Sequence, residues 1–453
     1  MASSMLFKIA LISCCLIVAT AGDKKKAAPT PADDKKAAPA PAGDSSSAAN
    51  ATSASAASGG SGVFDVTKYS ASTSASASAN SKAFTDAFKA ACAFKGQPTV
   101  SIPAGTYQLG PVVFEGPCIG SHITFDIKGT LVAIPDNSAF PGPAWLEFDA
   151  LHELVVQGGG IIDGQGKASW TQGGKDKAIN MRFMKCNNGK ITGITSKDSK
   201  FFHFALHNSQ GLIFDSVKVV APWDSKNTDG IHMSMSSNIT LNAMDIGTGD
   251  DCISIGQGTN NVQITGCNIG SLGKVPNEQN VGNIHVKSCT VQHTSNGVRI
   301  KTWPGAPPSE AFGITFEDIT MTNVSNPIII DQLYCPDGEC TNKNPSNVKI
   351  RDITFSGVKG TSNTEVAVKL ACSEKVPCTN VILQDIALQP TGTGCSKVSS
   401  LCTNVQGGVK GTIKPDPCIG AGAGKSGGNT TASAPSSSAS ASPPAKKAKK
   451  ASS

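Results

Sequence analysis

Three aspartates stand in two short polar motifs of the sequence. Asp229 belongs to the run Asn-Thr-Asp-Gly at 227–230, and Asp250 and Asp251 belong to the run at 249–256. Asp250 follows Asp229 by 21 residues (250 − 229), about one turn of a strand solenoid. Stacked turns lie about 4.8 Å apart, so the spacing predicts that the three carboxylates meet on one face. Neighbouring carboxylates cannot all ionise freely, and a protonated acid beside a carboxylate is the pair that glycoside hydrolysis needs.

Each aspartate taken alone has a simpler explanation. Asp side chains often fill turns because they bond to nearby backbone groups, and for any single position that explanation is favoured. The set of three in register favours a functional site.

Two cations follow at Arg299 and Lys301, on either side of Ile300. In a strand this alternation points both cations to one face. Arg offers a bidentate fork and Lys a point charge, so the pair beside an acidic cluster predicts a substrate that is itself a carboxylate. A solvated strand face is the alternative explanation for the pair in isolation.

The elements that must position these residues repeat along the chain. From about residue 120, short β-branched runs alternate apolar with polar residues between Gly, Asn and Asp, which is typical of half-buried strands. Repeats of this length without a helical period predict a solenoid whose turns bury their aliphatics by stacking on one another. The aliphatic anchors of successive turns, spaced by 21, 27, 23, 22, 30, 34 and 33 residues, are Ile191, Leu212, Ile239, Val262, Ile284, Ile314, Val348 and Val381.

The predicted fold is all-β: one right-handed parallel β-helix with a short N-terminal capping helix and disordered tails. The helix is expected at 82–94, where Phe84, Phe88, Ala91 and Cys92 fall on one side and would cover the open edges of the first strands.

The ends of the chain differ from its middle. Residues 1–22 read as a secretory signal, with Lys8 before a short apolar core, and no later run is long enough for a membrane span. Residues 23–62 and 420–453 are rich in Ala, Ser, Pro and Lys and are expected to be disordered. Their Ala-Pro and Ser-Pro runs resemble O-glycosylated wall-protein segments. We therefore predict a secreted, extracellular, cell-wall protein with one β-helix domain at 63–419 and no membrane partner.

The net charge of +6 belongs to these ends. Of the 39 Lys and Arg residues, 11 lie in the signal and the two tails, and of the 33 Asp and Glu residues four lie there. The middle therefore carries 28 positive and 29 negative side chains, close to −1. A nucleic-acid partner loses its main support.

Thirteen of the 15 cysteines remain after the signal. In an exported protein this number favours disulfides over zinc. Close spacing makes Cys335 with Cys340 and Cys372 with Cys378 disulfide candidates, and a further group lies at Cys395, Cys402 and Cys418. Glycosylation sequons occur at Asn50, Asn238, Asn323 and Asn429.

Several motifs occur together in one order along the chain. They are Asn227-Thr228-Asp229-Gly230, Gly249-Asp250-Asp251-Cys252-Ile253-Ser254-Ile255-Gly256, Ile269-Gly270-Ser271-Leu272-Gly273, Gly297-Val298-Arg299-Ile300-Lys301 and Pro327-Ile328-Ile329-Ile330-Asp331-Gln332. With them, residues 63–419 resemble the polygalacturonase family of glycoside hydrolases, and most closely its plant exo-acting pollen type.

The resemblance implies an enzyme that hydrolyses α-1,4-linked galacturonan with inversion, without a metal or other cofactor. Asp250 matches the general acid, and Asp229 and Asp251 match the carboxylates that activate water. The expected partner is polygalacturonate or pectin, and a monomer is expected. The matched substrate-binding positions are Asn227, Arg299, Lys301 and Tyr334.

One family motif, Gly-Pro-Gly-His-Gly, is missing before the run at 269–273. Cys267 matches the cysteine that precedes this motif in the family and pairs with Cys252. The lost histidine tunes the acid site in the family, so activity is expected to be reduced but not abolished. His232 is a candidate substitute, although an ordinary strand residue is the favoured explanation.

Three alternatives stay open. A pectin-binding wall protein with little activity would keep the two cations. A pectate lyase shares the fold but needs calcium. A structural glycoprotein fits the tails but leaves the ordered Asp and Arg/Lys motifs unexplained. The sequence does not distinguish exo from endo action.

Overall fold

The computed structural model describes residues 62–120, 122–171, 177–265, 278–335, 340, 343–392 and 394–420. The predicted signal, most of both predicted tails, Cys267 and the sequons Asn50 and Asn429 lie outside these residues. Within them, no helix is long and apolar enough to cross a membrane.

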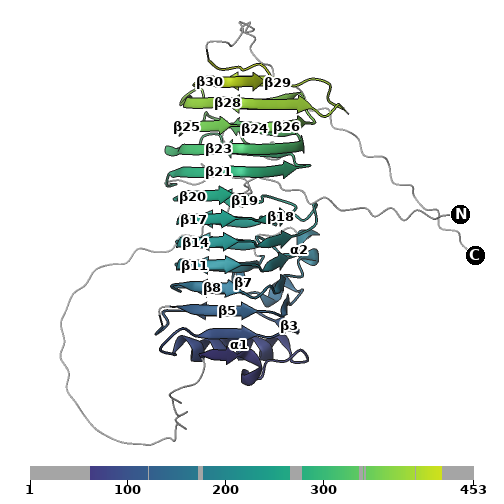
Figure 1. Ribbon diagram of the computed structural model, residues 1–453, viewed down its shortest axis with the longest axis vertical. Helices are drawn as coiled ribbons and strands as arrows, with labels where there is room; N and C mark the ends of the chain where they lie inside the picture. Colours follow the sequence, from purple (N-terminus) through teal and green to yellow (C-terminus); the bar gives the residue numbers. More distant parts are fainter. Residues whose placement is uncertain are drawn as a thin grey trace, which may run out of the picture.

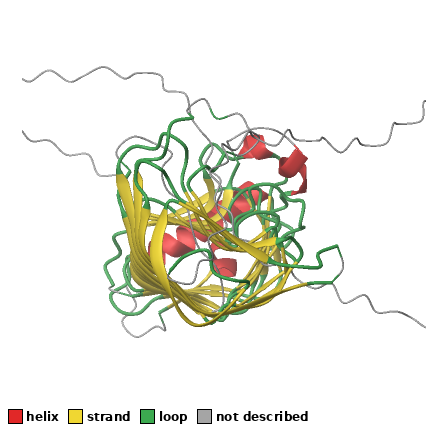
Figure 2. Ribbon diagram, turned by 90° about the horizontal axis from the view of Figure 1, so that it is seen from above, coloured by secondary structure: helices red, strands yellow, loops and turns green. Residues whose placement is uncertain are grey.

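The described residues form a parallel β-helix, as predicted. In Figure 1 the strands stack as rungs along the long axis, and the view along that axis in Figure 2 shows them lining up behind one another as walls. The strands pair in parallel within four sheets of the described chain.

The longest sheet has fourteen strands. They are β1 (Val63–Asp65), β2 (Thr99–Ile102), β5 (Ile123–Ile127), β8 (Leu154–Gln157), β11 (Asn187–Thr192), β14 (Gln210–Asp215), β17 (Ser237–Asn242), β20 (Asn260–Thr265), β21 (Val281–Gln292), β23 (Ser309–Val324), β25 (Val348–Ser356), β26 (Lys359–Ser362), β28 (Cys378–Pro390) and β30 (Val405–Lys414).

Three shorter sheets complete the walls. The first holds β4 (Val112–Glu115), β7 (Ala144–Asp149), β10 (Ile179–Met184), β13 (Phe204–His207), β16 (Ile231–Ser234) and β19 (Ile253–Ile255). The second holds β3 (Thr106–Leu109), β6 (Thr130–Ala133), β9 (Ile161–Asp163), β12 (Thr195–Lys197), β15 (Lys218–Val220) and β18 (Asp245–Gly247). The third holds β22 (Asn296–Lys301), β24 (Asn326–Asp331), β27 (Val366–Ala371) and β29 (Ser399–Thr403).

Most of the predicted aliphatic anchors share one column of the longest sheet. Leu212, Ile239, Val262, Ile284 and Ile314 follow one another in register from β14 to β23. Two anchors were misplaced. The partner of Leu212 on β11 is Gly189 rather than Ile191, and Val348 pairs with Ser309 rather than Ile314, because sequence spacing does not reveal how long each turn loop is.

Helix α1 (Ala77–Cys92) covers the N-terminal end of the stack, at the opposite end from β29 and β30 in Figure 1. It begins earlier than predicted because Ser76 caps it, accepting a hydrogen bond from the Ala79 N–H at 3.2 Å. Its apolar face is buried, and a disulfide links its last residue, Cys92, to Cys118. The other helical segments are η1 (Val66–Tyr69), η2 (Asn137–Ala139) and α2 (Lys167–Thr171).

A column of phenylalanines fills the N-terminal part of the core. Successive rings of Phe114, Phe125, Phe148, Phe183 and Phe214 have centroids 4.7 to 5.8 Å apart, and all five side chains are buried. Phe148 and Phe183 stack nearly face to face, at 5.1 Å and 9°. Neighbouring rungs place side chains at this separation, so inward-facing aromatics meet across rungs.

A second column runs along one corner of the longest sheet. Asn238, Asn261 and Asn283 stand at paired positions with positive φ, a conformation that Asn tolerates better than most residues. The Asn261 amide donates to Asn238 Oδ1, and the Asn283 amide donates to Asn261 Oδ1, each at 3.2 Å. This amide column therefore keeps three consecutive turns in register.

Two predicted disulfide pairs are bonded, Cys335 with Cys340 and Cys372 with Cys378. In the C-terminal group, Cys402 bonds Cys418.

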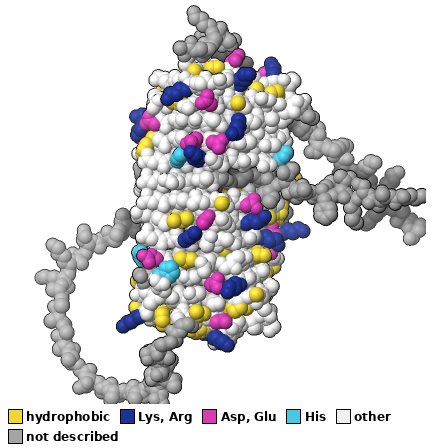
Figure 3. All heavy atoms as spheres, in the orientation of Figure 1, with side chains coloured by type: hydrophobic (Ala, Val, Ile, Leu, Met, Phe, Trp, Pro, Cys, Tyr) yellow, Lys and Arg dark blue, Asp and Glu magenta, His cyan; other side chains and the backbone are white. Residues whose placement is uncertain are grey.

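Charges of both signs are interspersed on the face seen in Figure 3. Ion pairs such as Lys287–Glu317 at 2.7 Å and Lys359–Asp318 at 2.9 Å join neighbouring strands. This pairing agrees with the near-neutral charge counted for the middle of the chain.

Candidate active site

The three aspartates meet where two strands of one sheet begin. Asp229 lies just before β16, and Asp250 and Asp251 lie just before β19. One carboxylate oxygen of each aspartate lies within 4.8 Å of those of the other two. The rung partner of Asp229 is Asp251, since the Gly230 N–H donates to the Asp251 carbonyl at 2.7 Å and Ile231 pairs with Ile253. The spacing that positions the cluster is thus 22 residues (251 − 229) rather than 21.

Backbone groups hold Asp250. Its Oδ2 accepts from the Asn227 N–H at 3.1 Å, and its Oδ1 accepts from the Asp251 N–H at 3.0 Å. Asn227 adopts a left-handed backbone with φ of 58°, which turns its N–H toward the carboxylate. Asn227 therefore reaches the site through its backbone.

A close backbone crossing fixes the position of this loop. A Cβ on Gly249 would lie 2.3 Å from the Ser225 carbonyl oxygen, so only glycine fits there. The Gly249 N–H donates to the Thr228 hydroxyl at 3.1 Å and thereby joins the two motifs.

The three carboxyl groups differ in exposure. Asp250 is partly exposed, whereas Asp229 is 1 % exposed and Asp251 is fully buried. Asp229 Oδ2 accepts a hydrogen bond from the Ser254 hydroxyl at 2.8 Å. Neither oxygen of Asp251 has a hydrogen-bond partner among the described residues. Asp250 is therefore the carboxyl group of the three that solvent and substrate reach.

Burial raises the pKa of all three carboxyl groups. The pKa values of Asp229 and Asp251 rise well above the usual Asp value, and the neighbouring aspartates raise both further. The two backbone N–H groups and Lys301 oppose the rise at Asp250. Such close groups titrate as a set, and the cluster holds protons at a pH where isolated aspartates are ionised.

Arg299 and Lys301 on β22 are both buried, 6 % and 1 % exposed, so the alternative of a solvated strand face is wrong. Their cations lie against the Tyr334 ring, with Arg299 Cζ 4.7 Å and Lys301 Nζ 4.1 Å from its centroid. Arg299 also pairs with Asp331 at 3.8 Å. The Coulombic influence of Asp229, Asp250 and Asp251 reaches Lys301, which brings the cations and the acids into one site.

Both cations keep unused donors. Arg299 Nε and Lys301 Nζ are buried and have no hydrogen-bond partner among the described residues. Burial lowers the pKa of Lys301 to about 7, although the aspartates favour its charged form. Buried donors of this kind favour an anionic ligand.

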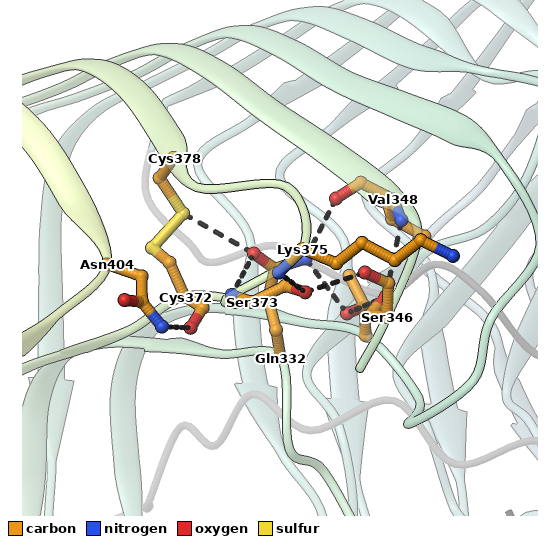
Figure 4. The surroundings of a disulfide bond; sticks show 9 residues. Gln332, Ser346, Val348, Cys372, Ser373, Lys375, Cys378 and Asn404 are labelled. Carbon is orange, nitrogen blue, oxygen red and sulfur yellow. Dashed lines mark hydrogen bonds between the residues drawn. A yellow bond between two sulfur atoms is a disulfide. The ribbon is translucent and has the colours of Figure 1, made fainter. Parts of the chain in front are cut away.

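The segment that carries Asp331 and Tyr334 is anchored at Gln332. This fully buried side chain donates to the Val348 carbonyl at 2.8 Å and accepts from the Ser373 N–H at 3.0 Å. Figure 4 shows Gln332 between the Cys372–Cys378 disulfide and Val348. The turn closed by this disulfide thus supports the segment whose Tyr334 ring lies against the two cations.

Oxygens as close as those of the aspartate cluster can also hold a metal ion. Calcium takes about six to eight oxygen ligands, whereas this cluster offers three carboxylates and has buried cations beside it. The donor set fits an internal counter-charge to Lys301 better than a calcium site.

Two residues at the site, Asp331 and Ser254, carried no predicted role, and a third, His232, was expected to be an ordinary strand residue or a substitute for the missing histidine. Asp331 and Ser254 stand inside the family motifs, but nothing in a sequence shows which neighbours a motif residue contacts. His232 contacts Ser254, with its Nδ1 2.7 Å from the hydroxyl oxygen.

Comparison with known proteins decides the family. The sequence profile of glycosyl hydrolases family 28 matches residues 92–413. The chain belongs to this family. It is 43 % identical over 368 residues to an exopolygalacturonase of Platanus acerifolia, covering 78 % of this chain and 97 % of that protein. It is 44 % identical over 355 residues to a polygalacturonase of Gossypium barbadense, covering 75 % and 86 %.

Solved structures share the fold of this family 28 chain. An exopolygalacturonase from Thermotoga maritima matches with a TM-score of 0.64 at 16 % identity, covering 79 % of this chain and 91 % of that one. A polygalacturonase from Erwinia carotovora matches with a TM-score of 0.54 at 24 % identity, covering 72 % and 93 %. The protein is thus a glycoside hydrolase, and the lyase and structural-glycoprotein alternatives are set aside.

Proposed function

We propose that this family 28 enzyme hydrolyses α-1,4-galacturonosyl linkages of pectin with inversion, and that it acts from chain ends. The observation that carries the proposed hydrolysis of an acidic sugar polymer is the carboxyl cluster, in which one oxygen of each residue lies within 4.8 Å of the others, beside two buried cations with unused donors. Inversion is proposed from the resemblance to the family. The names of its relatives, exopolygalacturonase and polygalacturonase, support the substrate and the exo action.

In this proposal Asp250 is the general acid. It is the partly exposed carboxyl group of the cluster, so it can contact the glycosidic oxygen and protonate it as the bond breaks. Its two backbone hydrogen bonds favour the anion in the free enzyme. A bound galacturonate places a further negative charge nearby, which raises the pKa of Asp250 and favours the protonated form.

Asp229 and Asp251 act as the base that activates water. Both are buried and pair with each other across neighbouring rungs, and an ionised carboxylate there accepts a proton as the water attacks the anomeric carbon. Attack from the face opposite the leaving group inverts the anomeric configuration.

Arg299 and Lys301 bind the galacturonate carboxylate in the sugar ring that reacts. The unused Arg299 Nε and Lys301 Nζ donors supply hydrogen bonds and charge, and Tyr334 fixes both side chains from beneath. Asn227 supports the site through its hydrogen bond to Asp250.

A second candidate is a pectin-binding wall protein with impaired catalysis. It is favoured by the missing Gly-Pro-Gly-His-Gly motif before residues 269–273. Both candidates bind substrate through the two cations, so binding does not distinguish them.

Release of reducing ends from polygalacturonate separates the two candidates. The hydrolase is expected to release galacturonate monomers, and an Asp250→Asn variant is expected to release almost none while still binding the polymer. Proton NMR of the first product identifies its anomer and so tests inversion. A wild-type protein that binds polygalacturonate but releases no more product than Asp250→Asn establishes the impaired wall protein instead.

We also propose that the protein is secreted to the cell wall, with residues 1–22 as its signal. A reporter carrying these residues is expected to be exported with the leader removed, and an intracellular, uncleaved reporter would contradict this.

A further inference from the structure

His232, Ser254 and Asp229 form a continuous chain of close contacts. His232 on β16 and Ser254 on β19 are rung partners. The His232 Nδ1 lies 2.7 Å from the Ser254 hydroxyl oxygen, which lies 2.8 Å from Asp229 Oδ2. Ser254 is fully buried, so bulk water does not interrupt the chain.

The number of available protons decides which group donates in each of these hydrogen bonds. A serine hydroxyl carries one proton, and Ser254 donates that proton to Asp229. The contact between Ser254 and His232 then needs a proton on Nδ1. Burial lowers the pKa of His232 to about 4, so at neutral pH the ring is uncharged and carries its single proton on Nδ1.

The His232 ring is also held in orientation. It stacks on Phe202 with a centroid separation of 4.6 Å and an interplanar angle of 19°. Together with strand pairing, this contact orients Nδ1 toward the Ser254 hydroxyl.

We propose that His232 and Ser254 are positioning residues for the water-activating base. The imidazole donates to Ser254 and polarises it, and Ser254 donates to Asp229, which stabilises the carboxylate in its ionised form and fixes its rotation. Consecutive hydrogen bonds of this kind strengthen one another. The inference rests on the base role proposed above for Asp229.

Other charged groups face Asp229, and their effects must be separated from that of the chain. Asp250 raises its pKa, whereas Lys301 lowers it. Asp251 pairs with it across the rung, and Arg299 acts on Asp251. Among the described residues, two histidines on the neighbouring rung also lie near. The backbone N–H of His203 donates to the Asp229 carbonyl, and His207 acts on His232.

The same sheet contains a matched pair without a carboxylate. His207 Nδ1 lies 2.9 Å from the Ser234 hydroxyl oxygen, again across neighbouring strands. In the described part of the chain Ser234 makes no hydrogen bond to the aspartate cluster, so it serves as the control for removing a serine that contacts a histidine.

The first test is the pH dependence of kcat/KM on polygalacturonate, whose acidic limb reports the pKa of the base in the free enzyme. Ser254→Ala removes the donor to Asp229, and His232→Phe keeps the ring stack but removes the donor to Ser254. Both are expected to move the acidic limb to higher pH, by about half a unit or more, because the ionised base loses stabilisation. The loss of kcat is expected to exceed any change in KM.

Two variants give the opposite expectation. His232→Asn places an amide N–H where Nδ1 stands but removes the ring, and it is expected to keep the wild-type limb. Ser234→Ala is expected to keep it as well. The positioning role is overturned if the acidic limb stays in place in Ser254→Ala and His232→Phe. It is also overturned if His232→Asn or Ser234→Ala shifts the limb equally. Either result leaves His232 as a packing residue.

The second test does not need catalysis. Nitrogen-15 NMR of the imidazoles is expected to show the His232 proton on Nδ1 in the wild-type protein and on Nε2, the form favoured in water, in Ser254→Ala. An Nε2-bound proton in the wild type contradicts the inference. A wild type with the Nδ1 proton but without hydrolysis contradicts the proposed function and leaves the hydrogen-bond chain established.

Discussion

The phenylalanine column and the aspartate cluster are built by the same strand stacking and have opposite energetic consequences. Ring centroids in the column lie 4.7 to 5.8 Å apart, and one oxygen of each carboxyl group in the cluster lies within 4.8 Å of the others. Apolar rings gain from this proximity because they leave water together. Carboxylates lose by it because burial and like charge both disfavour their ionised forms.

The contrast shows that the β-helix supplies proximity and the sequence decides how it is used. Rungs filled with Phe or Ile stabilise the solenoid, and this stability offsets the cost of burying Asp251 and Lys301 elsewhere. Substitutions in the two regions should therefore have opposite signatures, one lowering stability and the other lowering activity.

The largest expected effect is on activity. Asp250→Asn removes the proposed acid without changing side-chain shape, and reducing-end release is expected to fall by about 10²–10⁴-fold while the thermal melt stays within a few degrees. Asp245→Asn, at an exposed aspartate that pairs with Lys218, is the control and should keep full activity. A collapsed fold in Asp250→Asn would contradict the separation of the two regions.

The next effect is on stability. Phe148 contacts Phe114, Phe125 and Phe183, so Phe148→Ala is expected to lower the free energy of unfolding by about 3–5 kcal/mol, measured by denaturant unfolding. Phe148→Leu keeps most of the volume and should cost less. Activity per folded molecule should be unchanged in both, and a selective loss of kcat would show that the column also shapes the site.

A smaller effect is expected from the charge of Lys301. Its pKa of about 7 in the free enzyme means that it is charged below this pH and neutral above it. The value of kcat/KM should therefore fall as pH rises through 7. Lys301→Arg keeps a cation at higher pH, so its profile should extend further into the alkaline range, whereas a wild-type profile flat to pH 9 would contradict substrate binding by the charged lysine.

The smallest effect separates burial cost from function. Folding raises the pKa of Asp251 above that of an unfolded aspartate. The folded state is therefore destabilised relative to the unfolded state as pH rises above the pKa of the unfolded aspartate. Asp251→Asn removes this cost and is expected to raise the melting temperature by about 2 °C or more at pH 7, with the gain shrinking toward pH 4. Equal melts at both pH values would mean that the burial of Asp251 is not costly.

Much of the fold could be predicted because each rung repeats the same alternation. The column from Leu212 to Ile314 shows this, and the exceptions at Ile191 and Val348 arose where a loop changed the residue count per turn. The bond between Cys92 and Cys118 was missed because its partners belong to the cap and to a later loop.

For the candidate site, the sequence predicted which residues would lie together but not their environment. Motif order identified the aspartates, Arg299 and Lys301. Burial of the two cations depends on Tyr334 and on the support of Gln332 from other rungs. The contact of His232 with Ser254 likewise joins residues 22 positions apart (254 − 232), so a local reading sees only an ordinary strand residue.

The amide column bears on how the family's scaffold changes in evolution. Asn261 and Asn283 are bonded and in register across β20 and β21, the two strands that flank the place where the Gly-Pro-Gly-His-Gly motif is missing. The amide contact joins β20 to β21 independently of the connection between them, so we expect that connection to change its length without shifting either strand. A loop bearing the motif should be graftable there, so loss and return of the histidine become edits to one connection rather than to the architecture.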